Sequence, residues 1–245
     1  RVSWPTKSCA ISASGRVAKM NRPRTRIYLI TPPRLDLETF VPLLDETLAA
    51  GDVGCLQLRL KGAADGPEDH GVIGAALEAI KPITHAHDVA LLVNDSPALA
   101  KQYDCDGVHI GQEDGDFKQA RALLGDDKII GVTCHNSRHM AMTAGDAGAD
   151  YVAFGAFYPS QTKQTQSVAS VDILSWWQEL MQPPCVAIGG ITVENAVPLI
   201  LAGADFLAVS SSVWNHKDGP AAAIADFNAM LDSQFSTLFD TLNHD

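Results

Sequence analysis

From Arg26 onward, short runs rich in Val, Ile and Leu alternate with longer amphipathic segments. Such alternation is typical of βα units, whose strands lie parallel in one sheet. Eight units within residues 26–245 fit an α/β fold with a single closed (β/α)8 TIM barrel better than an open doubly wound sheet. The predicted strands are 26–31, 55–61, 90–95, 107–112, 129–135, 151–157, 185–190 and 206–212.

Helices are predicted between these strands, for example at 37–51, 137–149 and 192–204. The last two end in the same Ala-Gly-Ala-Asp sequence, at 147–150 and 202–205. Because glycine commonly ends a helix, we interpret these segments as repeats of one structural unit.

The composition limits the classes of partner. Hydrophobic residues make up 46% of the chain and charged residues 19%, which favours a large core over general disorder. The formal net charge of −11 disfavours a nucleic-acid surface or binding to an anionic membrane. No apolar stretch approaches the roughly 18 residues of a membrane span. We therefore expect small-molecule ligands, no nucleic acid and no membrane.

The five cysteines are scattered without CxxC spacing, so we expect reduced thiols in a cytoplasmic protein. Residues 1–25 contain no acidic residue and are rich in Ser. We expect a disordered extension there, followed by one catalytic domain at 26–245. A transit peptide, or a true start at Met20, would leave a similar sequence.

Polar residues gather where the predicted strands end. The chemistry of a (β/α)8 barrel lies at the carboxyl ends of its strands, so these residues predict an active site on that face. They are Gln57, Arg59, Lys61, Asn94, Asp95, Gln112, Asp114, Thr133, His135, Ser160, Thr162, Lys163, Gly189, Gly190, Ser210 and Ser211.

The segment QLRLK (57–61) places two cations on one face of a strand. Alternation turns Gln57, Arg59 and Lys61 toward the barrel interior and the two leucines toward the helices. Buried unpaired charge is costly, so these cations indicate an anionic ligand at the barrel mouth. An internal salt bridge is the alternative.

Asp95 and Asp114 follow two successive strands and are predicted to lie close together. Two carboxylates without a nearby cysteine suit Mg2+, which proteins often hold with one or two carboxylates and the phosphates of a substrate. Capping of the following helix would explain either residue singly. The cations of QLRLK favour a site for Mg2+ and phosphate.

Two later segments suggest phosphate binding. Ser160, Thr162 and Lys163 lie in a polar loop after the sixth strand, where a plain surface loop is the alternative. Gly190 follows the seventh strand, and Ser210 and Ser211 follow the eighth, which matches the common phosphate site of barrels.

Two histidines have different predicted roles. His109 lies within a strand and is interpreted as a core histidine with satisfied hydrogen bonds. His135 ends a strand and is the better candidate for the site. Trp176 and Trp177 lie in a predicted helix and are expected to pack outside the barrel.

The segments QLRLK, LLVND, DGVHIGQED, IIGVTCH, GADYVAFGAFYPSQTK, VAIGGIT and AGADFLAVSS occur in order between residues 26 and 215. Together they resemble the thiamine phosphate synthase family, whose superfamily includes the thiazole tautomerases. The resemblance implies a Mg2+-dependent transferase that joins a pyrimidine diphosphate to a thiazole phosphate in thiamine biosynthesis.

The resemblance also implies residue roles. Gln57, Arg59, Lys61 and Asn94 would bind the pyrimidine diphosphate, with Thr133 and Lys163. Asp95 and Asp114 would hold the metal. Ser160 and Thr162 would receive the thiazole phosphate, and Gly190, Ser210 and Ser211 would complete its pocket. Arg59, Lys61 and Lys163 would assist departure of the diphosphate.

The sequence departs from the family pattern at Leu60, where an acid is frequent, and at Ser160, where Thr is usual. The segment after the eighth strand is also unusually polar, and the loop after the second strand is unusual. These departures leave the fine specificity open. A thiazole tautomerase and a non-catalytic thiamine-phosphate-binding protein remain alternatives, and the oligomeric state is open, a homo-oligomer included.

Overall fold

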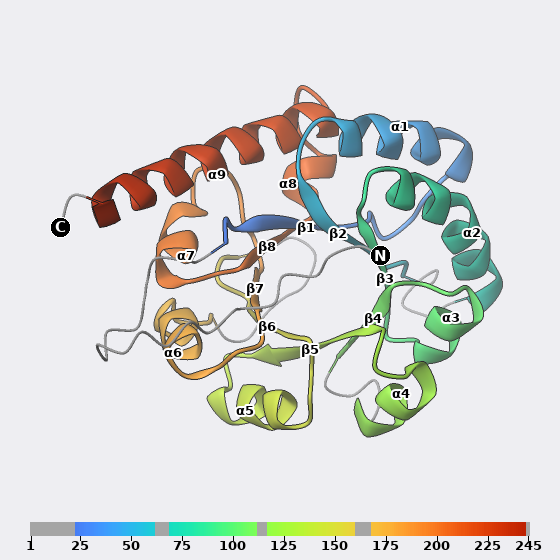
Figure 1. Cartoon of the computed structure of the whole chain (residues 1–245). Coiled ribbons are helices and arrows are strands. Elements are labelled where there is room, and N and C mark those ends of the chain that lie inside the picture. Colours follow the sequence, from blue (N-terminus) through green and yellow to red (C-terminus); the bar gives the residue numbers. More distant parts are fainter. Residues whose placement is uncertain (1–22, 62–68, 112–116, 160–167, 244–245) are drawn as a thin grey trace.

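The computed structural model describes residues 23–61, 69–111, 117–159 and 168–243. Eight parallel strands close into a barrel in chain order, β1 to β8, and helices surround it (Figure 1). The predicted (β/α)8 architecture is therefore confirmed. The strands are β1 (Arg26–Ile30), β2 (Val53–Leu58), β3 (Ala90–Asn94), β4 (Gly107–Ile110), β5 (Ile129–His135), β6 (Tyr151–Gly155), β7 (Cys185–Ile188) and β8 (Phe206–Val209).

Most strands lie where the apolar runs predicted them, but β2 ends three residues earlier than expected. Beyond Leu58 the backbone leaves the ladder and bonds to the segment after β1. The Arg59 N–H donates to Thr31 Oγ1 over 3.0 Å, and the Lys61 N–H donates to the Pro33 carbonyl over 2.9 Å. The basic segment therefore lies at the mouth of the barrel.

Helices follow the strands around the outside (Figure 1). The helix expected at 192–204 begins only at Val197, because a turn precedes it in which Thr192 N–H donates to Asn195 Oδ1. The described helices are α1 (Leu37–Ala49), α2 (His70–Ala86), α3 (Pro97–Gln102), α4 (Phe117–Leu124), α5 (Arg138–Asp146), α6 (Asp172–Leu180), α7 (Val197–Ala202), α8 (Ser211–Trp214) and α9 (Pro220–Asn243).

The core has two layers, one inside the barrel and one between the strands and the helices. Trp177 belongs to the outer layer, where it is fully buried and meets the Phe154 ring edge-on at 5.7 Å. This confirms that it packs outside the barrel. The inner layer includes Tyr28, Ile30, Cys55, Ala90, Leu92, Tyr151, Ala153, Val186, Phe206 and Ala208.

An aspartate stands directly before each of β4, β6 and β8, and it forms two hydrogen bonds with the preceding strand. Its carboxylate accepts the N–H of a residue in the neighbouring strand, and its own N–H donates back to that residue's carbonyl. The two Ala-Gly-Ala-Asp segments therefore have the same structure. Their glycines, Gly148 and Gly203, both have positive φ, at 91° and 118°. The pairs are Asp106–Leu91 at 2.8 Å, Asp150–Ile130 at 2.7 Å and Asp205–Cys185 at 2.8 Å.

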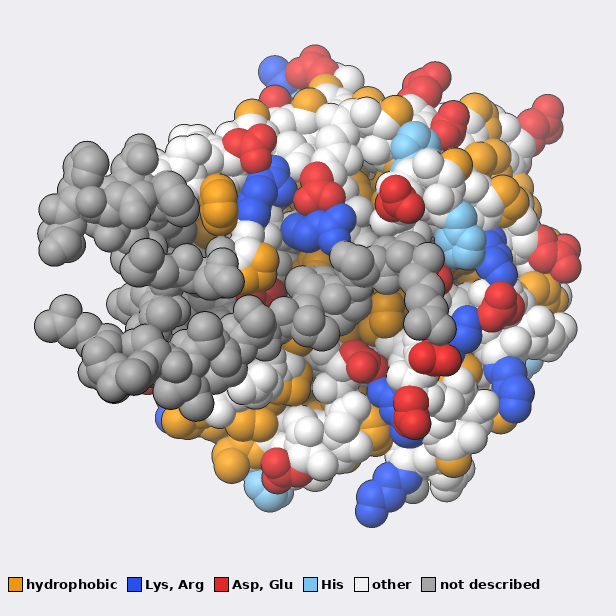
Figure 2. Space-filling model, in the orientation of Figure 1, with side chains coloured by type: hydrophobic (Ala, Val, Ile, Leu, Met, Phe, Trp, Pro, Cys, Tyr) orange, Lys and Arg blue, Asp and Glu red, His pale blue; other side chains and the backbone are white. Residues whose placement is uncertain are grey.

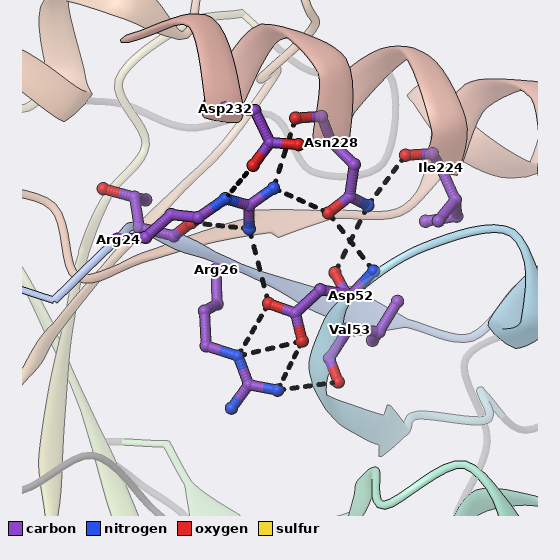
Figure 3. A network of polar contacts seen from close by, with 8 residues as sticks. Arg24, Arg26, Asp52, Val53, Ile224, Asn228 and Asp232 are labelled. Carbon is purple, nitrogen blue, oxygen red and sulfur yellow. Dashed lines mark hydrogen bonds and ion pairs between the residues drawn. The ribbon is translucent and has the colours of Figure 1, made fainter. Parts of the chain in front are cut away.

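Asp52, which precedes β2, has different partners (Figure 3). Its carboxylate accepts from Arg26 at 2.6 Å and from Arg24 at 3.3 Å, and Arg26 has a raised pKa because of its hydrogen bond to Asp52. Arg24 also reaches α9 through Asn228 and Asp232. The network joins β1, β2 and α9.

Residues 1–22 lie outside the described residues, so the disordered extension expected at the N-terminus stays a prediction.

The described part of the chain contains no helix long and apolar enough to cross a membrane. Figure 2 shows acidic and basic side chains interspersed on the face in view rather than a continuous basic patch. The absence of a nucleic-acid partner stays an expectation from the net charge of −11.

The aspartate before β8 provides a stability test. Asp205→Ala leaves the buried Cys185 N–H and the Gln178 amide without this acceptor, so we expect a loss of about 3 kcal/mol in the free energy of unfolding. Asp205→Asn, which keeps one acceptor oxygen, should lose less. Urea unfolding measures both, with exposed Asp218→Ala as a control that should change by less than about 0.5 kcal/mol. Equal stability of the Asp205→Ala and control variants would contradict the assignment.

Candidate active site

The structure describes most of the predicted site. These residues form two groups: polar side chains at or just beyond the carboxyl ends of β2, β3 and β5, and small residues after β7 and β8. The described site residues are Gln57, Arg59, Lys61, Asn94, Asp95, Thr133, His135, Gly189, Gly190, Ser210 and Ser211. Gln112, Asp114, Ser160, Thr162 and Lys163 lie outside the described residues.

Gln57 and the two leucines of the QLRLK segment have the orientations predicted from the sequence. Gln57 is buried inside the barrel, whereas Leu58 and Leu60 belong to the outer core. Arg59 is half-buried, and its charge acts on His109 inside the barrel. Arg59 forms no ion pair with another described residue. The described residues therefore do not support the alternative of an internal salt bridge.

Gln57 is fixed by hydrogen bonds on both sides. Its Oε1 accepts from the Tyr28 hydroxyl at 3.0 Å, and its Nε2 donates to Asn94 Oδ1 at 2.6 Å. Asn94 Nδ2 in turn donates to Asp95 Oδ2. Two buried amides are thereby held between a phenol and a carboxylate, which orients their remaining donors and acceptors.

A second set of contacts continues from Tyr28 to the other side of the barrel. Its hydroxyl lies 2.8 Å from the Tyr151 hydroxyl, which lies 2.8 Å from His109 Nδ1. His109 Nε2 is 2.8 Å from Thr133 Oγ1. Thr133 therefore shares one polar network with Gln57 and Asn94, although its strand is not adjacent to theirs.

His109 is the satisfied core histidine that the sequence predicted. Both ring nitrogens have partners, and burial followed by the charge of Arg59 lowers its pKa from 6.5 to about 4. Burial also raises the pKa values of Tyr28 and Tyr151 well above the ordinary value, so both phenols stay neutral. The sequence analysis missed these tyrosines; their inward positions on two apolar strands were the available signal.

Asp95 lies where β3 and β4 end. It has a positive φ of 57°, and its Oδ1 accepts the Gly111 N–H at 3.2 Å. The alternative that Asp95 caps the next helix is wrong, because Ser96 caps α3 by accepting from Leu99 N–H. Its carboxylate instead faces Gly111, which follows β4.

Asp95 supplies a carboxylate at the end of β3, and carboxylate oxygens are ligands that Mg2+ prefers. Within the described ranges, however, no three His, Cys, Asp or Glu side chains gather closely enough to hold a metal ion. The second predicted ligand, Asp114, lies outside those ranges. The metal site therefore stays a prediction.

The glycines after β7 make room for the loop after β6. A Cβ on Gly189 would lie 2.4 Å from the Ala156 Cβ, and one on Gly190 would lie 2.3 Å from the Pro159 carbonyl oxygen. Both glycines also have positive φ, at 107° and 62°. The structure thus supplies a packing reason for this pair. It also places the residues just before Ser160 against Gly190.

The serines after β8 begin the short helix α8. Ser210 Oγ donates to the Thr31 carbonyl at 3.4 Å, and Ser211 is exposed. The sequence analysis did not single out Ser212, whose Oγ is buried and has no hydrogen-bond partner among the described residues. The three hydroxyls all follow the strand that borders β1 and β7.

Comparisons with known proteins identify the family of this chain. Residues 27–213 match the sequence model of the family described as thiamine monophosphate synthase. The chain belongs to this family. The thiamine-phosphate synthase of Rhodospirillum centenum is 58% identical over 206 residues, covering 84% of this chain and 97% of that protein. That of Hyphomonas neptunium is 57% identical over 213 residues, covering 86% and 96%.

Solved structures agree with the family assignment. The thiamine phosphate pyrophosphorylase of Pyrococcus furiosus matches with a TM-score of 0.73 and 28% identity, over 87% of this chain and 98% of that chain. A geranylgeranylglyceryl phosphate synthase from Thermoplasma acidophilum shares the fold alone, with a TM-score of 0.62 and 16% identity over 86% and 94%. The family resemblance inferred from the motifs is confirmed.

The lowered pKa of His109 makes a prediction about stability. Between pH 6.5 and about 4 the unfolded chain binds a proton at this residue and the folded chain does not, so stability falls as pH falls through that window. From pH 7 to pH 5, the wild type should lose about 2 kcal/mol more than His109→Gln. Denaturant unfolding at both pH values measures the difference, and parallel losses would refute the prediction.

Proposed function

We propose that this chain joins an aminopyrimidine diphosphate to a thiazole phosphate and releases pyrophosphate, forming thiamine phosphate. The observation that supports it most is the 58% identity to a thiamine-phosphate synthase across nearly the whole of that protein. The chain is thus a transferase. The half-buried Arg59 beside the array of Gln57, Asn94 and Asp95 offers an anionic substrate both charge and fixed hydrogen bonds.

In the proposed reaction, the bond between the pyrimidine methylene and the diphosphate breaks first. Arg59, Lys61 and Lys163 stabilise the negative charge on the departing diphosphate, while the amino-substituted ring delocalises the positive charge. The thiazole nitrogen then forms a bond to the methylene carbon. Gln57, Asn94 and Thr133 orient the pyrimidine, so the rate enhancement comes mainly from positioning and electrostatics.

No strong general base is needed for this substitution, because the attacking thiazole nitrogen has a free electron pair. The described interior agrees with that requirement. His109 uses both ring nitrogens in contacts with protein groups, and Tyr28 and Tyr151 are neutral phenols. The charged groups lie instead at the mouth of the barrel.

We propose that Asp95 and Asp114 hold Mg2+, which when bound would neutralise part of the charge of the diphosphate. The carboxylate of Asp95, held by the Gly111 N–H and the Asn94 amide, supports this assignment. Few protein ligands suit an ion that binds mainly together with substrate phosphates. We expect weak binding of Mg2+ until the diphosphate is present.

A second anionic subsite is proposed for the thiazole phosphate. Ser160 and Thr162 would bind it together with Gly190, Ser210 and Ser211. The packing of Pro159 against Gly190 supports a shared pocket, because it brings the loop after β6 to the end of β7. Two separate anionic substrates require two such subsites.

One assay separates this function from its alternatives. Purified protein is mixed with both phosphorylated substrates, with and without Mg2+, and pyrophosphate release is followed. Release that requires both substrates supports the transferase. Conversion of a thiazole tautomer without pyrophosphate release would identify a tautomerase, and tight binding of thiamine phosphate without turnover would identify a binding protein.

Removal of one charged site residue should strongly reduce turnover. We expect Arg59→Ala, and likewise Asp114→Ala, to lower turnover at least about a hundredfold, the scale of losing one preorganised electrostatic contact. Lys217→Ala is a matched control, because Lys217 is an exposed cation paired with Asp218. Near-normal rates in both site variants would exclude the proposed site for metal and diphosphate.

Chelation tests the metal. We expect EDTA to abolish pyrophosphate release and added Mg2+ to restore it. Asp95→Asn should need at least about tenfold more Mg2+ for half-maximal rate, because one negative ligand is lost. Full activity in EDTA would contradict the magnesium assignment.

We also propose a cytoplasmic location for the protein. The described cysteines are buried free thiols, which supports the cytoplasmic location expected from the sequence.

A further inference from the structure

One continuous chain of hydrogen bonds crosses the barrel interior. It uses one side chain from each of six successive strands, β1 to β6, and ends on the carboxylate that follows β3. The order is Thr133, His109, Tyr151, Tyr28, Gln57, Asn94 and Asp95.

We propose that the carboxylate of Asp95 sets the direction of every proton in this chain, so that His109 keeps its proton on Nδ1 and Thr133 meets the substrate as a hydrogen-bond acceptor. The ordering itself is a property of the protein alone. Its effect on the reaction rests on the proposed function. Tyr28, Tyr151 and His109 are then positioning residues that act through Gln57 and Thr133.

The direction begins at Asp95, because an ionised carboxylate can only accept. Asn94 must therefore present Nδ2 to it, which turns Asn94 Oδ1 toward Gln57. Gln57 then donates from Nε2 and leaves Oε1 to accept from the Tyr28 hydroxyl. Both amide orientations follow from one acceptor.

The directions of the remaining hydrogen bonds, at Tyr28, Tyr151 and His109, follow from the number of protons on each group. A phenol has one proton, and Tyr28 gives its own to Gln57, so Tyr151 must donate to Tyr28. Tyr151 then accepts from His109, whose Nδ1 therefore carries a proton. In the neutral ring Nε2 has no proton and accepts from the Thr133 hydroxyl.

This ordering matters at the mouth of the barrel. The single hydroxyl proton of Thr133 is directed toward His109, so only lone pairs of Thr133 Oγ1 face a ligand. An N–H donor, such as the amino group of an aminopyrimidine, is therefore favoured there over an acceptor. Because the bonds of a chain polarise one another, a break at one end changes the groups at the other.

The first test measures the tautomer directly. Protein labelled with 15N-histidine is studied at pH 7 by long-range 1H–15N correlation NMR, and His109 is assigned by its loss in His109→Gln. We expect a neutral ring protonated on Nδ1. Protonation on Nε2 in the wild type would overturn the proposal, and this measurement needs neither turnover nor a folded Tyr variant.

The second test breaks the chain away from the histidine. Tyr28→Phe removes the oxygen that accepts the proton of the Tyr151 hydroxyl. The Tyr151 hydroxyl can then donate to His109 Nδ1 instead, which favours the ring protonated on Nε2. We expect the ratio of Nδ1-protonated to Nε2-protonated ring to fall at least about tenfold. Tyr103→Phe, a matched change outside the barrel next to α2 and α3, should leave the ratio unchanged.

Kinetics of the same variants test the positioning role. Tyr28→Phe should lower kcat/KM for the pyrimidine diphosphate about tenfold and leave KM for the thiazole phosphate unchanged, since Gln57 and Thr133 belong to the pyrimidine subsite. A tautomer change without this kinetic change would overturn the positioning role. The predicted tautomer in a protein that forms no thiamine phosphate would support the ordering and refute the proposed function.

Discussion

Closure of the parallel ladder determines the position of every functional group in this protein. Because β8 pairs with β1 as well as with β7, each strand has a neighbour on both sides. The carboxyl ends of all eight strands therefore form one ring. Residues as distant in sequence as Tyr28 and Tyr151 can then share a hydrogen bond. An open sheet would leave β1 and β6 too far apart for that contact.

The interior of the ring combines burial with complete polar pairing. Tyr28, Gln57, His109 and Tyr151 are all buried, and each has hydrogen-bond partners within the barrel. Burial of unpaired groups would cost several kcal/mol in all, so the network is needed for the fold as well as for a ligand. Burial also keeps the phenols and the imidazole neutral. Charged groups, such as Arg59, lie at the mouth of the barrel instead.

Several features of the site could be predicted because they depend on local pattern. Alternation placed Gln57 inside and Leu58 outside, and the position of His109 within a strand indicated a core histidine. The role of Asp95 could not be separated from helix capping in this way, since both uses place an acid after a strand. The neighbouring Ser96 decides it by supplying the cap itself.

The glycines after β7 show a second limit of local pattern. The position of Gly190 after the seventh strand matched the common phosphate site, but an added Cβ at Gly189 or Gly190 would first meet atoms of the segment after β6. That contact joins the segment after β6 to the end of β7, on the far side of helix α6, and it forms because β6 and β7 pair as neighbours. Nothing in the residues around either segment specifies it.

The sequence by itself determined the fold class, the order of the strands and the face on which the polar residues gather. Periodicity and helix-ending glycines are local properties, so they can be recognised without coordinates. Only the tertiary structure decided that Tyr28 and Tyr151 connect Gln57 to His109 and Thr133. A hydrogen bond requires two atoms about 3 Å apart, and closure of the barrel, rather than any local pattern, brings these atoms together.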